Sequence, residues 1–243
     1  FFLSVSLINT LGYAEQVTVA VASNFSAPMK AIVNAFEQQT QHKVRLAFGS
    51  SGKFFAQIKQ NAPFDVFLSA DQEKPNALKK DRLIVAGSQF TYALGALVLW
   101  SPKPGLVDEQ GRVLERGGYH KLALANPKLA PYGKAAVEVL TKVGLLERTR
   151  PHWVLGENIS QAYQFVASGN VDLGFLAVSQ VMADGKIAKG SYWKIPAELY
   201  QPIRQDAVLL QRGKDNLAAR ELLAFLKSEQ VLSIARKYGY QTQ

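Results

Sequence analysis

Apolar and polar residues alternate in blocks along the chain, and these blocks predict strands and helices in turn. Residues 17–21 (VTVAV) are β-branched and almost continuously apolar, as in a strand buried on both faces. The next segment has the i, i+3, i+4, i+7 spacing of an amphipathic helix, at Met29, Ile32, Val33 and Phe36. Strand and helix then repeat, which predicts βαβαβ units and a parallel sheet with right-handed crossovers.

Two such α/β units follow one another. The further predicted strands are 44–48, 65–70, 93–100, 121–126, 152–156, 172–177 and 207–211, and the further helices are 53–60, 133–143, 160–167 and a pair over 220–238. The simplest arrangement inserts the second unit into the first, with connections crossing between two lobes near residues 95 and 206. Ligands of open α/β sheets lie beyond the carboxyl ends of the strands, so we expect a site in the cleft between the lobes.

Residues 1–14 (FFLSVSLINTLGYA) are uncharged and mostly apolar, and they end in the Gly12-x-Ala14 pattern of a signal-peptidase site. We expect them to be the remnant of a signal peptide whose removal leaves Glu15 as the mature start; a first core strand or helix is the alternative. No later segment has the roughly 20 uninterrupted apolar residues of a membrane span. The sequence therefore predicts an exported chain without membrane insertion.

The amino-acid composition excludes several kinds of catalytic and metal-binding site. With 243 residues, 48% of them hydrophobic, the chain is long enough for two lobes with substantial cores. It has no cysteine, which excludes disulfides, thiol nucleophiles, cysteine metal sites and a lipoprotein anchor. Its three histidines (His42, His120 and His152) are far apart and lack ligand spacing. We therefore expect neither metal-ligating nor histidine-triad chemistry, and no cofactor.

The formal net charge is +9, from 28 Lys and Arg against 19 Asp and Glu. The basic residues are scattered, and their tightest clusters are pairs such as Lys79-Lys80. A nucleic-acid interface would need a basic stripe with interleaved aromatic residues. The charge instead predicts a diffuse positive surface and no nucleic-acid partner.

Four strand-to-helix junctions carry small or polar residues where a ligand can approach: 22–25 (ASNF), 49–52 (GSSG), 126–133 (NPKLAPYG) and 156–160 (GENIS). Free N–H groups and the helix dipole make each helix start a weak anion site. The hydroxyls of Ser23 and Ser51 and the amide of Asn24 add neutral donors. Taken alone, each junction is better explained by helix N-capping. Two such junctions from each lobe, facing one cleft, together predict a binding site for one small anion.

An enzyme on the same two-lobe scaffold is the alternative from another class. Catalysis requires a base or nucleophile with a partner, and no histidine can be paired with Ser51 from the sequence. Asp71 resembles a catalytic carboxylate, but it stands where a helix N-cap is expected. The residues therefore favour a binding protein over an enzyme.

Six segments follow one another in collinear order over essentially the whole mature chain: AVASNF, the strand–GSSG–helix segment, APFDVFLSADQEKPNAL, NPKLAPYGKAAVEVL, GENISQAYQFVASGNVDLGFLAVSQ and ARKYGY. Together they resemble the periplasmic molybdate-binding proteins of ABC importers. The resemblance implies an α/β, type II-like periplasmic-binding-protein fold, with two Rossmann-like lobes joined by two crossover hinge strands. The implied division is 1–14 for the signal-peptide remnant, 15–95 plus 207–243 for the first lobe, and 96–206 for the second.

The resemblance also implies a function: a periplasmic monomer captures a tetrahedral oxyanion and delivers it to a membrane permease. The family's first-lobe donors fall on Ser23, with Asn24 beside it, and on Ser51. Its second-lobe main-chain donors fall on Tyr132 and Ile159. The implied metal-site residues (Ser23, Ser51, Tyr132 and Ile159) would contact the oxygen atoms of the oxyanion and not the metal itself.

One position departs from the family pattern. Some members use a tyrosine hydroxyl just after the strand that here reads GFLA, residues 174–177. Ala177 has no side-chain donor, so we expect Asn24 and Tyr132 to replace that contact.

Hydrogen-bond chemistry predicts which oxyanion binds. A fully deprotonated oxyanion such as molybdate only accepts hydrogen bonds, so neutral N–H and O–H donors suit it. Phosphate carries a proton at neutral pH, and the one carboxylate at the four junctions, Glu157, is expected to point away; an unpaired buried group costs about 1–3 kcal/mol. Tungstate is nearly the same size as molybdate and is expected to bind. A receptor for sulfate, also a bare acceptor, or for another oxyanion stays the alternative.

Overall fold

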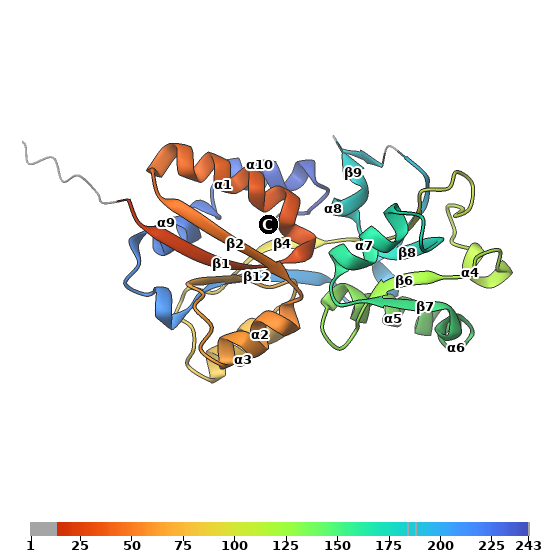
Figure 1. Ribbon diagram of the computed structural model, residues 1–243, viewed down its shortest axis with the longest axis horizontal. Helices are drawn as coiled ribbons and strands as arrows, with labels where there is room; N and C mark the ends of the chain where they lie inside the picture. Colours follow the sequence, from red (N-terminus) through yellow and green to blue (C-terminus); the bar gives the residue numbers. More distant parts are fainter. Residues whose placement is uncertain (1–13, 184, 188, 243) are drawn as a thin grey trace, which may run out of the picture.

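The computed structural model describes residues 14–183, 185–187 and 189–242. Two α/β lobes lie side by side, and each is built around a five-stranded sheet (Figure 1). The predicted signal-peptide remnant falls outside the described residues, apart from Ala14.

The sheet of the first lobe contains β1 (Gln16–Ala22), β2 (Lys43–Gly49), β3 (Val66–Leu68), β4 (Phe90–Gly95) and β12 (Ile203–Leu209). Its strand order is β2-β1-β3-β12-β4. β1 runs parallel to β2 and β3, whereas β12 runs antiparallel to β3 and β4. The parallel strands therefore direct their carboxyl ends toward one edge of the sheet, as the βαβαβ pattern predicts.

Helices cover both faces of this sheet. One face carries α1 (Ser26–Thr40), which follows the short η1 (Ser23–Phe25), together with α9 (Leu217–Phe225) and α10 (Glu229–Lys237); the other carries α2 (Ser51–Lys59) and α3 (Glu73–Lys80) (Figure 1). The alternation of β1 explains both layers, because Val19 packs in the α1 cluster and Ala20 in the α2–α3 cluster. The apolar face predicted for α1 is buried, at Met29, Ile32, Val33 and Phe36.

The second lobe has its own sheet, with β5 (Leu97–Ser101), β6 (Leu122–Ala125), β7 (Trp153–Gly156), β8 (Leu173–Ala177) and β11 (Ser191–Lys194). Its strand order is β11-β5-β8-β6-β7. The larger helices packed on it are α5 (Pro131–Lys142) and α7 (Ile159–Ala167), which contact β6 and β8. The shorter elements of this lobe are α4 (Val113–Arg116), α6 (Leu146–Thr149), η2 (Arg150–His152), α8 (Val178–Val181), β9 (Met182–Ala183), β10 (Lys186–Ile187) and η3 (Ala197–Leu199). In the first lobe, the short η4 (Gln211–Gly213) follows β12.

Some predicted strands differ from the structure. The apolar run 93–100 is not one strand: β4 ends at Gly95, and β5 begins at Leu97 in the other sheet. A continuous apolar run does not reveal this division, because both parts of it are buried or half-buried. The last strand begins at Ile203, ahead of the predicted residue 207, and β11 was not predicted.

Two connections join the lobes. β4 passes into β5 through Ala96, and β11 passes to β12 through residues 195–202. The predicted boundary between 206 and 207 falls inside β12, which is a strand of the first sheet. The helices α9 and α10 then pack on the face of the first lobe that α1 also covers, so both ends of the chain contribute to this lobe.

Asp172 holds three segments of the second lobe together. Its carboxylate accepts hydrogen bonds from Lys103 Nζ at 2.7 Å and from the backbone N–H groups of His120 at 2.8 Å and Lys121 at 3.1 Å. Burial raises the pKa of this carboxyl, but the three hydrogen bonds outweigh it and lower the pKa to about 2.

We expect Asp172→Asn to lower the free energy of unfolding at pH 7 by about 1–2 kcal/mol, a value reduced for solvent screening. The folded-state pKa lies below the unfolded value, so this stabilisation is present above about pH 4 and is lost as the pH falls toward 2. Urea denaturation at pH 7 and pH 3 measures the difference, which should shrink at pH 3. Asp215→Asn, at a side chain that is 85% exposed, is the control and should change little at either pH. A constant difference between the two pH values would contradict the prediction.

Candidate functional site

The four predicted junctions meet between the lobes. The N–H of Gly52 donates to the carbonyl oxygen of Leu129 at 2.9 Å, and Ser160 Oγ donates to the carbonyl oxygen of Ser23 at 3.1 Å. Each bond joins a helix start of the first lobe to a junction of the second. Because Gly52 follows Ser51 and Ser160 follows Ile159, these contacts bring the predicted site residues of both lobes into one region.

All five predicted site residues are buried at helix starts. Ser51 and Ile159 are the first residues of α2 and α7, and Tyr132 is the second residue of α5. Ser23 and Asn24 form the first turn of η1. Their exposed fractions are 4% or less.

Backbone N–H groups at these helix starts lack acceptors. An N–H in a first helical turn has no carbonyl partner within its own helix. The cap Asn158 accepts from Ser160 and Gln161 but not from Ile159, and the cap of α5 is Ala130, which has no side-chain acceptor. Within the described part of the chain, no acceptor lies in hydrogen-bond distance of the N–H groups of Ser51, Tyr132 and Ile159.

Serine hydroxyls add to these donors. Ser51 Oγ accepts a hydrogen bond from the N–H of Ala70 at 2.9 Å, so its own O–H remains available to donate. The carbonyl of Ser23 is engaged by Ser160, whereas its hydroxyl has no partner among residues 14–183, 185–187 and 189–242. The region therefore combines N–H and O–H donors that carry no formal charge.

The side chains of Asn24 and Tyr132 are used differently from the prediction. Asn24 Nδ2 donates to Gln205 Oε1 at 2.8 Å and to the Tyr240 hydroxyl at 2.9 Å, so both amide hydrogens are engaged. The Tyr132 hydroxyl accepts from Gln205 Nε2 at 3.2 Å. The Asn24 side chain thus contacts both the hinge strand β12 and the C-terminal segment, and the Tyr132 hydroxyl contacts β12. In this arrangement Asn24 can offer a ligand only its backbone N–H, and its replacement of the missing tyrosine hydroxyl stays a prediction.

Gln180 occupies the neighbourhood of Ala177, a role that the sequence analysis missed. The N–H of Ala177 donates to Gln180 Oε1 at 3.0 Å, and Gln180 Nε2 donates to the carbonyl oxygen of Ile159 at 3.1 Å. This side chain ties the end of β8 to the start of α7. A polar residue three positions after a buried strand was the available indication.

Charged side chains lie at the rim of this region. Lys53 Nζ lies 2.7 Å from Glu157 Oε1 across the lobes, and both side chains are about half exposed. Inside, burial raises the pKa of Tyr132 well above its ordinary value and raises the pKa of Tyr240 to about 12. These hydroxyls therefore stay protonated and uncharged at neutral pH.

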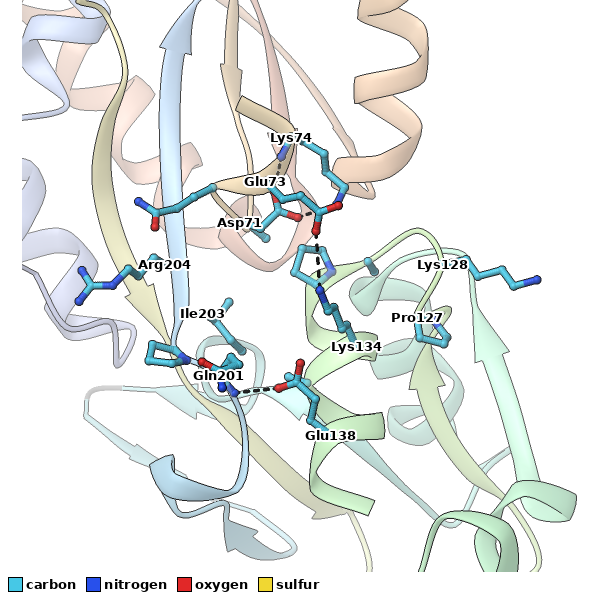
Figure 2. A pocket seen from close by; sticks show the side chains of 16 residues that line it. Asp71, Glu73, Lys74, Pro127, Lys128, Lys134, Glu138, Gln201, Ile203 and Arg204 are labelled. Carbon is cyan, nitrogen blue, oxygen red and sulfur yellow. Dashed lines mark hydrogen bonds and ion pairs between the residues drawn. The ribbon is translucent and has the colours of Figure 1, made fainter. Parts of the chain in front are cut away.

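A groove of about 400 Å³ opens beside this region, between the starts of α3 and α5 and the hinge residues 201–204 (Figure 2). Two ion pairs lie at this groove, the Asp71–Lys74 pair at 2.7 Å and the Glu73–Lys134 pair at 3.7 Å across the lobes. Asp71 also accepts from the N–H of Lys74 in the first turn of α3, although it lies one position before the N-cap Gln72 and not at the N-cap as expected.

The described residues lack two features. They contain no group of three or more His, Cys, Asp or Glu side chains placed to hold a metal ion. They also contain no helix with the length and apolar character needed to cross a membrane.

Two α/β lobes, two hinge connections and buried donors at the interlobe contact define the class of two-lobed binding proteins. The protein family described as bacterial extracellular solute-binding proteins matches residues 17–241. The chain belongs to this family.

Several individual proteins are similar to this chain over nearly its whole length. The chain is 53% identical over 241 residues to the molybdate-binding protein ModA of Azotobacter vinelandii, covering 99% of this chain and 96% of the relative. It is 51% identical over 230 residues to that of Rhodobacter capsulatus, with coverages of 95% and 90%. A solved Azotobacter vinelandii periplasmic molybdate-binding protein aligns with a TM-score of 0.91 and 39% identity over 93% of this chain and 99% of that one.

These comparisons confirm the predicted resemblance to the molybdate-binding proteins and the predicted fold class. The relatives are named as binding proteins, which confirms the choice of a binding protein over an enzyme. Molybdate is the ligand in their names and not a cofactor.

The close approach of the two lobes at Gly52 requires a residue without a side chain, and a substitution at this position can test that requirement. A Cβ at this position would lie 2.8 Å from the carbonyl oxygen and 3.1 Å from the Cα of Leu129, which are backbone atoms. We expect Gly52→Ala to hold the lobes apart and to raise the radius of gyration measured by small-angle scattering with molybdate added.

Lys53→Ala is the matched control on the same turn of α2. It removes only the half-exposed Lys53–Glu157 pair, and such pairs contribute about 0–1 kcal/mol. Its scattering should match that of the unmodified chain. Equal opening in both variants, or in neither, would contradict the steric argument.

Proposed function

We propose that the chain is the solute-binding component of an ABC importer and that it captures molybdate between its lobes. The observation that carries the proposal is the set of uncharged donors at buried helix starts, namely the N–H groups of Ser51, Tyr132 and Ile159 and the hydroxyl of Ser51. A fully deprotonated oxyanion accepts hydrogen bonds from all of them. The names of the relatives at 53% and 51% identity support molybdate as that oxyanion.

Each proposed contact has a defined role. Ser23 and Ser51 donate from their hydroxyls on the first lobe, and Asn24 donates from its backbone N–H. Tyr132 and Ile159 donate from their backbone N–H groups on the second lobe. These residues contact oxygen atoms and leave the molybdenum without a protein ligand. Helix starts favour this arrangement because the dipole adds a partial positive charge to each N–H group.

The same donors discriminate among oxyanions. Hydrogen phosphate brings a proton that needs an acceptor, and Glu157 is already paired with Lys53 at the rim. Burying that proton unpaired costs about 1–3 kcal/mol. Tungstate presents the same acceptors at nearly the same size, so we propose that it binds too. Sulfate also lacks a proton and differs from molybdate in size.

The cellular setting completes the proposal. Residues 1–14 have the apolar pattern of a signal peptide, and the family is described as extracellular, which supports export to the periplasm. The loaded monomer then delivers the anion to a membrane permease. Closing of the lobes about the two hinge connections encloses the anion between capture and delivery.

Calorimetric titration of the mature chain with molybdate, tungstate, sulfate and phosphate tests the ligand. We expect dissociation constants below about 1 μM for molybdate and tungstate, and binding of phosphate that is weaker by about 5-fold to 150-fold, the range to which a cost of about 1–3 kcal/mol corresponds. Absence of molybdate and tungstate binding would overturn the proposal. Sulfate binding as tight as molybdate binding would favour a general oxyanion receptor.

The double variant Ser23→Ala with Ser51→Ala tests the site. Hydrogen bonds to charged groups contribute about 1.5–3 kcal/mol each, so molybdate affinity should fall by about 100-fold or more. Ser88→Ala is the control, because this buried serine donates to the carbonyl of Val85 inside the first lobe at 2.7 Å. Thermal unfolding verifies that all variants fold. Unchanged affinity in the double variant would show that the anion binds elsewhere.

A further inference from the structure

Gln205 in the hinge strand β12 contacts both lobes through a fully buried side-chain amide. Its exposed fraction is 0%. Its Oε1 accepts from Asn24 Nδ2 at 2.8 Å and from the Tyr92 hydroxyl at 3.0 Å, both in the first lobe. Its Nε2 donates to the Tyr132 hydroxyl of the second lobe at 3.2 Å.

The hinge backbone is shaped to admit the Tyr132 hydroxyl. Gly95 closes β4, where the chain passes toward the second lobe. A Cβ on Gly95 would lie 2.1 Å from the Tyr132 hydroxyl and 2.6 Å from Gln205 Nε2. Glycine therefore leaves the space in which the second lobe reaches the hinge strand. The pairing of β12 with β4 is also irregular between Gln205 and Asp206, and such bulges redirect side chains.

A neutral amide suits this position because it presents an acceptor and a donor at once. Asn24 and Tyr92 each supply one hydrogen to Oε1, and the Tyr132 hydroxyl receives one from Nε2. A second connection runs in parallel, since Ser179 Oγ donates to the carbonyl oxygen of Asn24 at 3.0 Å. All these groups are buried, so a lost partner is not replaced by solvent without opening the lobes.

We propose that Gln205 is a positioning residue that fixes the first-lobe loop at Asn24 and the second-lobe helix start at Tyr132 in their ligand-binding arrangement. The inference rests on the proposed function, because Asn24 and Tyr132 are two of the proposed anion donors. Gln205 itself does not contact the anion. Separation of the lobes breaks the Gln205–Tyr132 bond before the anion leaves, so the amide slows release.

Release kinetics distinguish this role from a merely structural one. Gln205→Met keeps the side-chain volume and removes the amide. We expect it to raise the rate constant for molybdate release by about tenfold or more, while the association rate constant changes by less than about twofold. Tyr132→Phe keeps the backbone N–H and should have a similar effect. The double variant should release molybdate no faster than the faster single variant, because both substitutions remove the same bond.

Tyr92→Phe is the matched control. It removes a hydrogen bond of similar length to the same amide, but Tyr92 and Gln205 lie on neighbouring strands of one sheet. This variant should lower thermal stability and leave the release rate within about twofold of the unmodified chain. An unchanged release rate in Gln205→Met, or equal acceleration in Tyr92→Phe, would overturn the positioning role.

Spin-label distances separate failure of this inference from failure of the proposed function. The chain contains no cysteine, so Lys80→Cys and Glu109→Cys place one label on an exposed residue of each lobe. We expect Gln205→Met to lengthen or broaden the interlobe distance in the anion-free protein, and Tyr92→Phe to leave it unchanged. If no anion binds but this difference appears, the proposed function fails and the positioning of the lobes stands. If anions bind and no difference appears in distance or release, the positioning role fails alone.

Discussion

The proposed coupling of lobe closure to anion binding depends on one constraint: a buried N–H group needs an acceptor. The first-turn N–H groups of α2, α5 and α7 have no acceptor within their own helices. The hydrogen bond from the Gly52 N–H to the carbonyl oxygen of Leu129 joins the two lobes beside these helix starts. A buried donor without a partner costs about 1–3 kcal/mol, so several of them disfavour closure of an empty cleft. In the proposed function, an oxyanion in that place would satisfy all of them together. Closure and ligand binding would thereby be coupled through donors that carry no formal charge.

The contacts that hold the lobes together differ in strength according to burial. The Lys53–Glu157 and Lys134–Glu73 pairs are exposed, and ion pairs in that environment are screened by salt and contribute little. The bonds from Gln205 to Tyr132 and from Ser179 to Asn24 are buried and uncharged. Raised pKa values keep the tyrosine hydroxyls protonated at neutral pH. Closure is therefore governed by buried geometry at the hinge more than by the rim charges.

Local pattern carries much of this architecture. The period of α1 predicts its buried face, and the alternating blocks predict two α/β units. The polar junctions predict donors at Ser23, Asn24 and Ser51, and the family resemblance adds Tyr132 and Ile159. All five residues are buried at helix starts. The partners of those residues were not predictable from one sequence. Asn24 bonds to Gln205 and Tyr240, which are 181 and 216 positions away, and no local pattern selects one distant amide among many. The division of 93–100 between two sheets was not predictable either, because both parts of this apolar run are buried or half-buried and only their distant partners distinguish them.

The net charge of +9 and the neutral interior act on different steps of the proposed capture. Long-range attraction between a positive surface and an anion raises the encounter rate, and it weakens as salt increases. A cation inside the cleft would strengthen binding of every anion, protonated phosphate included. Neutral donors instead require each ligand oxygen to accept, so a proton on the ligand is penalised. In the proposed capture, a positive charge outside and hydrogen-bond donors inside would let one chain attract anions broadly and retain those that bear no proton.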